Sequence, residues 1–118
     1  MSKPHKKLIA WQKSMDLVVA IYDLTKAFPK DETYGLISQL RRAAVSVPSN
    51  IAEGAADRTT DQFRNFLSTA IGSLNEINTQ LELALRVGYI SQERHDIVQS
   101  VVDECLAVTF GLKRSLKR

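Results

Sequence analysis

Hydrophobic residues recur every three or four positions along almost the whole chain, and no sustained alternation of apolar and polar residues competes with this pattern. A period of this kind is typical of amphipathic α-helices. It predicts helices over residues 8–28, 33–55 and 60–87, and a fourth helix that begins after Ser91. Four long helices joined by short loops predict an all-α protein, an antiparallel up-down four-helix bundle that forms one domain over residues 1–118.

Residues that favour helix ends stand at the predicted boundaries: Pro29, Gly54, Thr59 with Gln62 as a capping box, Gly88 as a C-terminal stop and Ser91 as an N-cap. Pro48 is different, because it lies inside the second predicted helix. A proline there removes the hydrogen bond to the carbonyl of Ala44 and bends a helix rather than starting a new one. We therefore expect a kinked second helix.

The first predicted helix carries two apolar seams. One seam holds Leu8, Trp11, Met15, Val18 and Tyr22. The other holds Ala10, Leu17, Ile21, Leu24 and Phe28. A helix of a lone four-helix bundle needs about one apolar stripe, so the second seam predicts a further covering surface and hence a homo-oligomer. Trp11 and Tyr22 could stack on nucleic-acid bases, but their place in a seam favours packing.

Positive charge is concentrated at the two ends of the chain. The formal net charge is +3, yet residues 14–112 carry more acidic than basic residues. The ends hold eight cations and no acid: Lys3, Lys6, Lys7, Lys13, Lys113, Arg114, Lys117 and Arg118. An up-down bundle brings both ends to one pole, which predicts contact with the phosphate backbone of RNA or DNA and little sequence preference. The alternative is a pair of solvated basic tails that only keep the protein soluble.

The sequence offers few signals for catalysis, cofactors or metals. It has 118 residues, 44% hydrophobic and 25% charged, which is ordinary globular composition. There is no glycine-rich phosphate loop and no Glu-x-x-His motif, so we expect no enzyme, no cofactor and no metal. His5 and His95 are expected at the surface, and the lone Cys105 in the apolar stripe of the fourth helix. That stripe is predicted to hold Ile97, Val101, Cys105, Val108 and Leu112.

Location follows from two further features. No stretch of about 18 apolar residues is long enough to span a membrane. The single cysteine cannot form an internal disulfide, and a cytoplasmic protein is expected.

Two polar stripes run along the middle helices. The second predicted helix carries Gln39, Arg42, Ser46, Asn50 and Glu53, and the third carries Thr69, Ser73, Glu76 and Gln80. Solvated faces are one interpretation. The other is a buried network, with an Arg42–Glu76 ion pair within or between subunits, because serine, asparagine and threonine are mediocre helix formers and small residues flank them.

Several motifs resemble those of a known family: Trp11-Gln12-Lys13, Phe28-Pro29-Lys30, Tyr34-Gly35-Leu36, Gln39-Leu40-Arg41-Arg42-Ala43, Ser46-Val47-Pro48-Ser49-Asn50-Ile51-Ala52-Glu53-Gly54 and Gly72-Ser73-Leu74-x-Glu76. From Leu8 to about Ile90 the chain resembles the four-helix-bundle proteins of 23S ribosomal RNA intervening sequences, a family similar to accessory proteins of diversity-generating retroelements. The resemblance implies a small bacterial homopentamer without catalytic activity, whose role is poorly defined. The motif positions it singles out are Gln39, Arg41, Arg42, Asn50, Glu53 and Glu76.

Two functions of different classes follow. The first is a non-catalytic oligomer that associates with RNA or DNA through its basic ends. The second is a structural adaptor that docks a protein partner and binds no nucleic acid. Salt-sensitive binding to nucleic acid distinguishes the first from the second.

Overall fold

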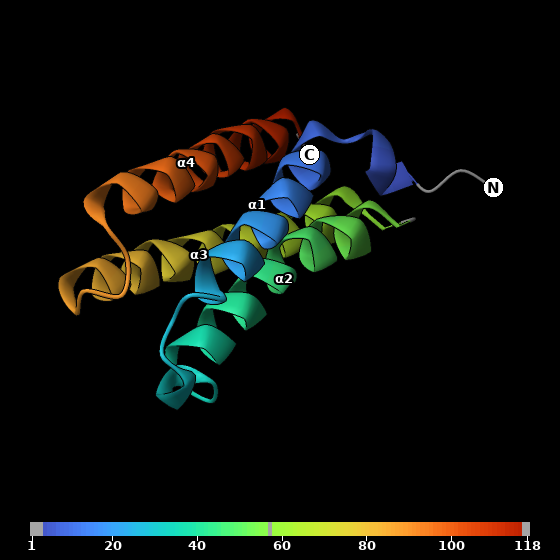
Figure 1. The fold of residues 1–118 in the computed structure, drawn as a ribbon. Helices are drawn as coiled ribbons and strands as arrows, with labels where there is room; N and C mark the ends of the chain where they lie inside the picture. Colours follow the sequence, from blue (N-terminus) through green and yellow to red (C-terminus); the bar gives the residue numbers. More distant parts are fainter. Residues whose placement is uncertain (1–3, 57, 117–118) are drawn as a thin grey trace.

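A computed structural model describes residues 4–56 and 58–116 of the chain. Its helices are α1 (Ile9–Thr25), α2 (Leu36–Ala55), α3 (Thr60–Arg86) and α4 (Gln92–Ser115), with short 3-10 helices η1 (Pro4–Lys7) and η2 (Lys30–Glu32). α1 and α3 each pack against both α2 and α4, and neighbouring helices run in opposite directions (Figure 1). The predicted all-α four-helix bundle is confirmed.

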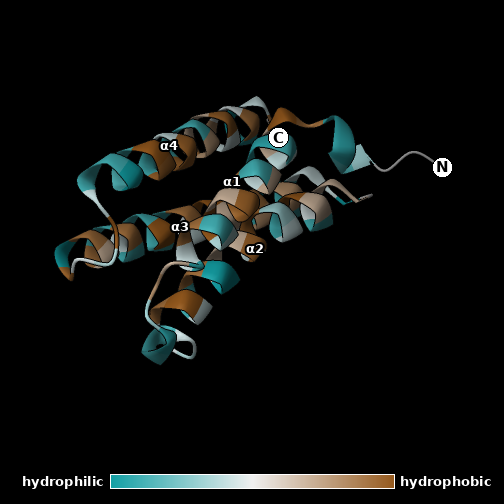
Figure 2. Ribbon diagram, in the orientation of Figure 1, coloured by the Kyte–Doolittle hydropathy of each residue, from teal (hydrophilic) through white to brown (hydrophobic). Residues whose placement is uncertain are grey.

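The core lies where the four helices face one another. Its largest fully buried side chains include Leu17, Ile21 and Leu24 of α1, Leu40, Val47 and Ile51 of α2, Leu67, Leu74, Ile77 and Leu81 of α3, and Val102 of α4. Hydrophobic stretches accordingly follow all four helices (Figure 2). The second predicted seam of α1, from Ala10 to Phe28, is buried in this core.

The buried stripe of α4 differs from the prediction by one position. Cys105 is buried as predicted. Val98, Val102 and Thr109 are buried in place of Ile97, Val101 and Val108, and Ile97 is 61% exposed. Apolar residues occupy two adjacent lines of this helix, so periodicity alone does not decide which line faces the core. The surface position expected for His95 was also wrong, because this side chain is only 9% exposed at the start of the same stripe.

α1 ends three residues earlier than predicted. Its last residue is Thr25, whose hydroxyl donates a hydrogen bond to the carbonyl of Ile21 at 2.8 Å. The chain then turns so that the Phe28 ring enters the core, 5.5 Å from the ring of Tyr89. The backbone N–H groups of Ala27 and Phe28 donate to the carbonyls of Leu24 and Thr25, three residues earlier, so the α-helical pattern has already ended before Pro29.

Gly54 does not end α2, as the sequence had suggested, but lies buried inside it. A Cβ atom at this position would be 2.8 Å from Cδ1 of Phe63 and 2.8 Å from Cβ of Phe66, both in α3. The glycine is therefore explained by the close approach of α3. α2 also runs without a break through Pro48, as expected, while its kink stays a prediction.

The remaining end signals are confirmed. Thr59 and Gln62 form the capping box of α3, and the side chain of Ser91 accepts a hydrogen bond from the backbone N–H of Arg94. Gly88 has a φ of +84°, a left-handed conformation that ends α3. The backbone N–H of Tyr89 then donates to the carbonyl of Ala84 at 2.9 Å.

The side chain of Glu32 links the α1–α2 connection by hydrogen bonds to the start of α2 and to the turn between α3 and α4. Its carboxylate accepts the backbone N–H of Leu36 at 3.1 Å and the hydroxyl of Tyr89 at 2.7 Å. These hydrogen bonds stabilise the charged carboxylate and lower the pKa of Glu32 below its ordinary value of 4.5. They also explain why α2 begins at Leu36 rather than at residue 33.

We expect a Glu32→Gln variant to melt at a lower temperature than the wild type at pH 7. A carboxylate whose pKa is lowered by folding stabilises the native state above its unfolded pKa, and this contribution is lost as the pH falls through the folded pKa. The difference between the two melting temperatures should therefore shrink between pH 5 and pH 3. Thermal melts followed by circular dichroism measure it, and an equal difference at both ends of this range would contradict the role of the charged form.

Candidate nucleic-acid interface

The two basic ends of the chain meet at one pole of the bundle. α1 begins and α4 ends at the same side of the molecule (Figure 1). A groove between them is lined by Lys7, Leu8, Ile9 and Ala10 from the N-terminal side and by Val108 and Leu112 of α4. Lys6, Lys7 and Arg114 are exposed there, and Lys113 is half-buried. Lys3, Lys117 and Arg118 lie outside the described residues.

Two arginines that the sequence analysis did not single out lie at the same pole, because α3 starts there. Arg64 donates from Nη1 to the carbonyls of Lys113 at 2.6 Å and Leu116 at 2.9 Å. It thereby satisfies backbone acceptors that the end of a helix leaves unpaired. Arg58 forms an ion pair with Glu53. Both arginines are far from the basic ends in the sequence. In an antiparallel bundle, however, the third helix starts at the end of the molecule where the chain begins and finishes, so residues near 60 are expected there. We call Lys6, Lys7, Arg58, Arg64, Lys113 and Arg114 the basic pole.

Lys13 differs from the other predicted cations. It lies inside α1 and forms an ion pair with Glu104 of α4. The hydrogen bond and the charge of Glu104 raise the pKa of the Lys13 ammonium above its ordinary value. This lysine joins α1 to α4, and its charge is offset by a neighbouring carboxylate.

The polar stripes of α2 and α3 meet through their small residues. The hydroxyl of Ser73 donates to Oγ of Ser46 at 2.9 Å, and the amide of Asn50 donates to the carbonyl and to Oγ of Ser46 at 2.8 and 3.0 Å. Arg42 and Glu76 are both exposed, and they form no ion pair within the described part of the chain. A buried Arg42–Glu76 pair within one subunit is therefore wrong, because the serines occupy the contact and the longer side chains flank it. A pair between subunits stays a prediction.

Arg41, another of the motif positions, has an internal role. Its Nε donates to Oγ1 of Thr25 at 2.8 Å, and its guanidinium carbon lies 4.5 Å from the centre of the Tyr22 ring. These contacts join α2 to the last turn of α1. Gln39, by contrast, is exposed. The motif thus combines residues that hold the bundle together with residues on its surface.

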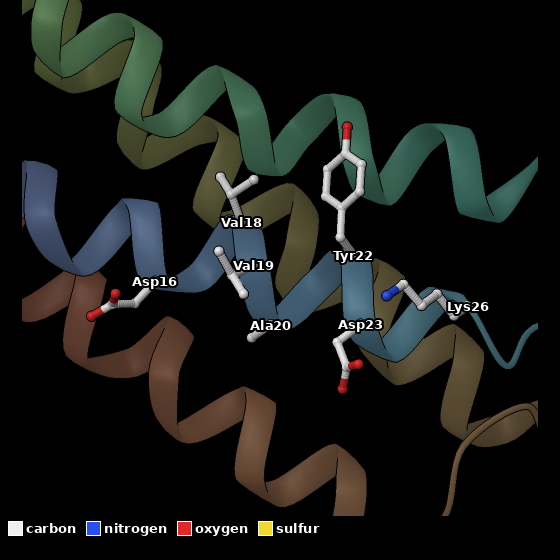
Figure 3. A pocket seen from close by; sticks show the side chains of 7 residues that line it. All are labelled: Asp16, Val18, Val19, Ala20, Tyr22, Asp23 and Lys26. Carbon is white, nitrogen blue, oxygen red and sulfur yellow. The ribbon is translucent and has the colours of Figure 1, made fainter.

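An apolar surface is left uncovered on α1. Met15 is 41% exposed, Val19 69%, Tyr22 39% and the adjacent Val45 of α2 41%. Val18, Val19 and Tyr22 line a hollow on this surface together with Asp16, Asp23 and Lys26, where Tyr22 points toward α2 and Asp23 toward α4 (Figure 3). We call Met15, Val18, Val19, Tyr22 and Val45 the α1 face. It contains part of the first predicted seam, whose residues from Leu8 to Tyr22 are all half-buried or exposed in the single chain.

Three further features of the described residues concern metal binding, the reactivity of the cysteine and the capacity of a helix to cross a membrane. No three His, Cys, Asp or Glu side chains between residues 4 and 116, residue 57 apart, gather so that they could hold a metal ion. Cys105 is buried, and burial raises the pKa of its thiol to about 12, which keeps it protonated at neutral pH. In the same part of the chain, no helix is long and apolar enough to cross a membrane.

A sequence profile of the 23S rRNA-intervening sequence protein family matches residues 6–111. The chain belongs to this family. This member also resembles the crystal structure of a protein of unknown function from the S23 ribosomal protein family of Bacteroides thetaiotaomicron, with a TM-score of 0.82. The match covers 90% of this chain and 96% of that one at 22% identity, so it shows a shared fold. No curated protein sequence matches the chain.

Proposed function

We propose that this protein is a non-catalytic, cytoplasmic oligomer that binds the phosphate backbone of RNA or DNA through the basic pole. The observation that carries the proposal is the convergence of Lys6, Lys7, Lys113 and Arg114, from opposite ends of the chain, at one end of the bundle. Clustered cations attract phosphates without reading bases. Binding is therefore expected to be steeply dependent on salt and nearly independent of sequence.

Favourable interactions with helix dipoles do not account for all the cations of the basic pole. Lys113 and Arg114 lie in the last turn of α4, where positive side chains are favourable beside the negative end of the helix dipole. Lys6 and Lys7 precede α1, beside the positive end of its dipole, where lysines are unfavourable. The two N-terminal lysines of the basic pole thus gain no stability from the dipole of α1, which supports a role in binding.

The α1 face supports the oligomeric part of the proposal. Four neighbouring apolar side chains there are each at least 39% exposed, and a second copy of the chain can cover them. The number five comes from the family resemblance alone. Several basic poles in one assembly raise the apparent affinity for a long polyanion, because each further contact is intramolecular.

The direct experiment is a fluorescence anisotropy titration of labelled RNA and DNA of equal length, from low to physiological salt. We expect both to bind at low salt. For each unit of log salt, the logarithm of the binding constant should fall by about 0.9 per phosphate contact on duplex DNA and by about 0.7 on a single strand. Absence of binding to either at low salt would overturn the nucleic-acid proposal.

A second candidate function is a structural adaptor for a protein partner. The observation that favours it is the same α1 face, since an uncovered apolar surface also suits a different protein. A monomer in solution that binds no nucleic acid would favour the adaptor. Nuclease treatment that leaves a purified complex intact would add to that case.

A further inference from the structure

An exposed aromatic ring stands beside the basic pole. Phe110 lies near the end of α4, and 43% of its surface is exposed. The chain's other three phenylalanines are more enclosed, since Phe28 is buried and Phe63 and Phe66 pack around Gly54. Among residues 4–56 and 58–116, the Phe110 ring has neither an aromatic partner nor a cation over its face. The stacking surface of this aromatic ring is therefore unused within the fold.

Phe110 lies on a different side of α4 from the contact with α1. Gln99 of α4 donates a hydrogen bond to Asn78 of α3, which fixes the side of α4 that is turned toward α3. Phe110 follows Gln99 by eleven positions, about three helical turns, and shares that side. Glu104, which pairs with Lys13 of α1, lies on another. The α1 face and its proposed oligomer contact thus leave the exposure of Phe110 unexplained.

Two cations lie one helical turn after Phe110. Lys113 and Arg114 follow Phe110 by three and four residues, a spacing that places side chains next to one another on a helix. The turn that carries them is held by Arg64, which donates to the carbonyls of Lys113 and Leu116 at 2.6 and 2.9 Å. The ring and its neighbouring charges therefore sit on a fixed end of α4 rather than on a loose tail.

We propose that Phe110 stacks on an unpaired base, so that the basic pole prefers single-stranded RNA or DNA to a duplex. This inference rests on the proposed nucleic-acid function and adds the class of nucleic acid. Bases in a duplex are already stacked and paired, and they offer this site only a phosphate backbone. An unpaired base gains a stacking contact with the ring while Lys113 and Arg114 attract the phosphates on either side of it.

The test compares a labelled single-stranded RNA of mixed sequence with an RNA duplex of the same length, at one low salt concentration. The wild type should bind the single strand more tightly. Phe110→Leu keeps an apolar side chain but removes the aromatic ring, and it should weaken single-strand binding roughly tenfold while leaving duplex binding unchanged. Phe110→Tyr should bind like the wild type. Tyr34→Leu removes a 96% exposed aromatic ring from the opposite end of the bundle and is the matched control, with no expected effect.

The possible failures are distinguishable. Equal affinity of the wild type for single strand and duplex, or the same affinities in Phe110→Leu as in the wild type, would overturn the stacking proposal and leave backbone binding intact. Failure of the wild type to bind either RNA, or the single-stranded and duplex DNA of the same length, would overturn the proposed function itself, and the stacking proposal with it. Thermal melts of each variant establish that the fold is kept.

Discussion

A Gly54→Val variant is expected to be less stable than the wild type by about 2 kcal/mol, within the range usual for an overpacked core. The new Cβ would lie 2.8 Å from two atoms of α3, and one of these is Cβ of Phe66. The Phe63 ring can rotate away from such a contact, but a Cβ atom moves only with its backbone. α2 and α3 must therefore separate where they pack most closely.

Gly72→Val is the matched control, because Gly72 is also inside a long helix, but a Cβ added there would meet no atom of another element within 4 Å. Valine is a somewhat better helix former than glycine, so this variant should be slightly more stable than the wild type. Urea unfolding followed by circular dichroism measures both changes. Equal effects of the two substitutions would contradict the close approach of α3 to Gly54.

The second large effect is expected on assembly. Val19→Glu places a charge on the α1 face at its most exposed residue, since 69% of the native residue is exposed in the single chain. Burying an unpaired carboxylate at an interface costs several kcal/mol, whereas the same side chain in water costs almost nothing. The variant should therefore keep its fold and dissociate to the 13.2 kDa of one chain.

Light scattering at micromolar concentration measures this change in mass. Val19→Ile keeps an apolar side chain at the same position and should assemble like the wild type. A wild type that is already a 13.2 kDa monomer would contradict the role assigned to the α1 face. A Val19→Glu variant that remains assembled would place the contact on another surface.

Periodicity was sufficient to predict the fold because each of the four long helices carries apolar residues three or four positions apart. In α3, the seam from Leu67 to Ala84 is buried as expected, and the capping box at Thr59 begins the helix where the sequence indicates. α4 has two adjacent apolar lines, and only its tertiary contacts with α1 and α3 decide that Val98 faces inward while Ile97 does not.

Contacts between distant residues limit what the sequence predicts about the site. The meeting of Lys7 with the end of α4 follows from topology and could be predicted. The hydrogen bonds from Arg64 to Lys113 and Leu116 join residues about fifty positions apart, and no local pattern announces them. The Arg42–Glu76 expectation failed within the subunit for a similar reason, since the hydroxyls of Ser46 and Ser73 make the contact between the stripes and Arg42 and Glu76 are exposed.

The proposed function requires nucleic acid to bind at one pole of the bundle rather than to the protein's overall charge. Two variants that each lose four positive charges test it by anisotropy with labelled RNA at low salt. One removes four exposed or half-buried cations of the basic pole by alanine substitution: Lys6, Lys7, Lys113 and Arg114. The other removes four exposed cations from the opposite end of the bundle: Lys26, Lys30, Arg86 and Arg94. We predict that the first variant loses binding and the second retains it, whereas equal losses, or full binding by the first variant, would contradict a basic-pole site.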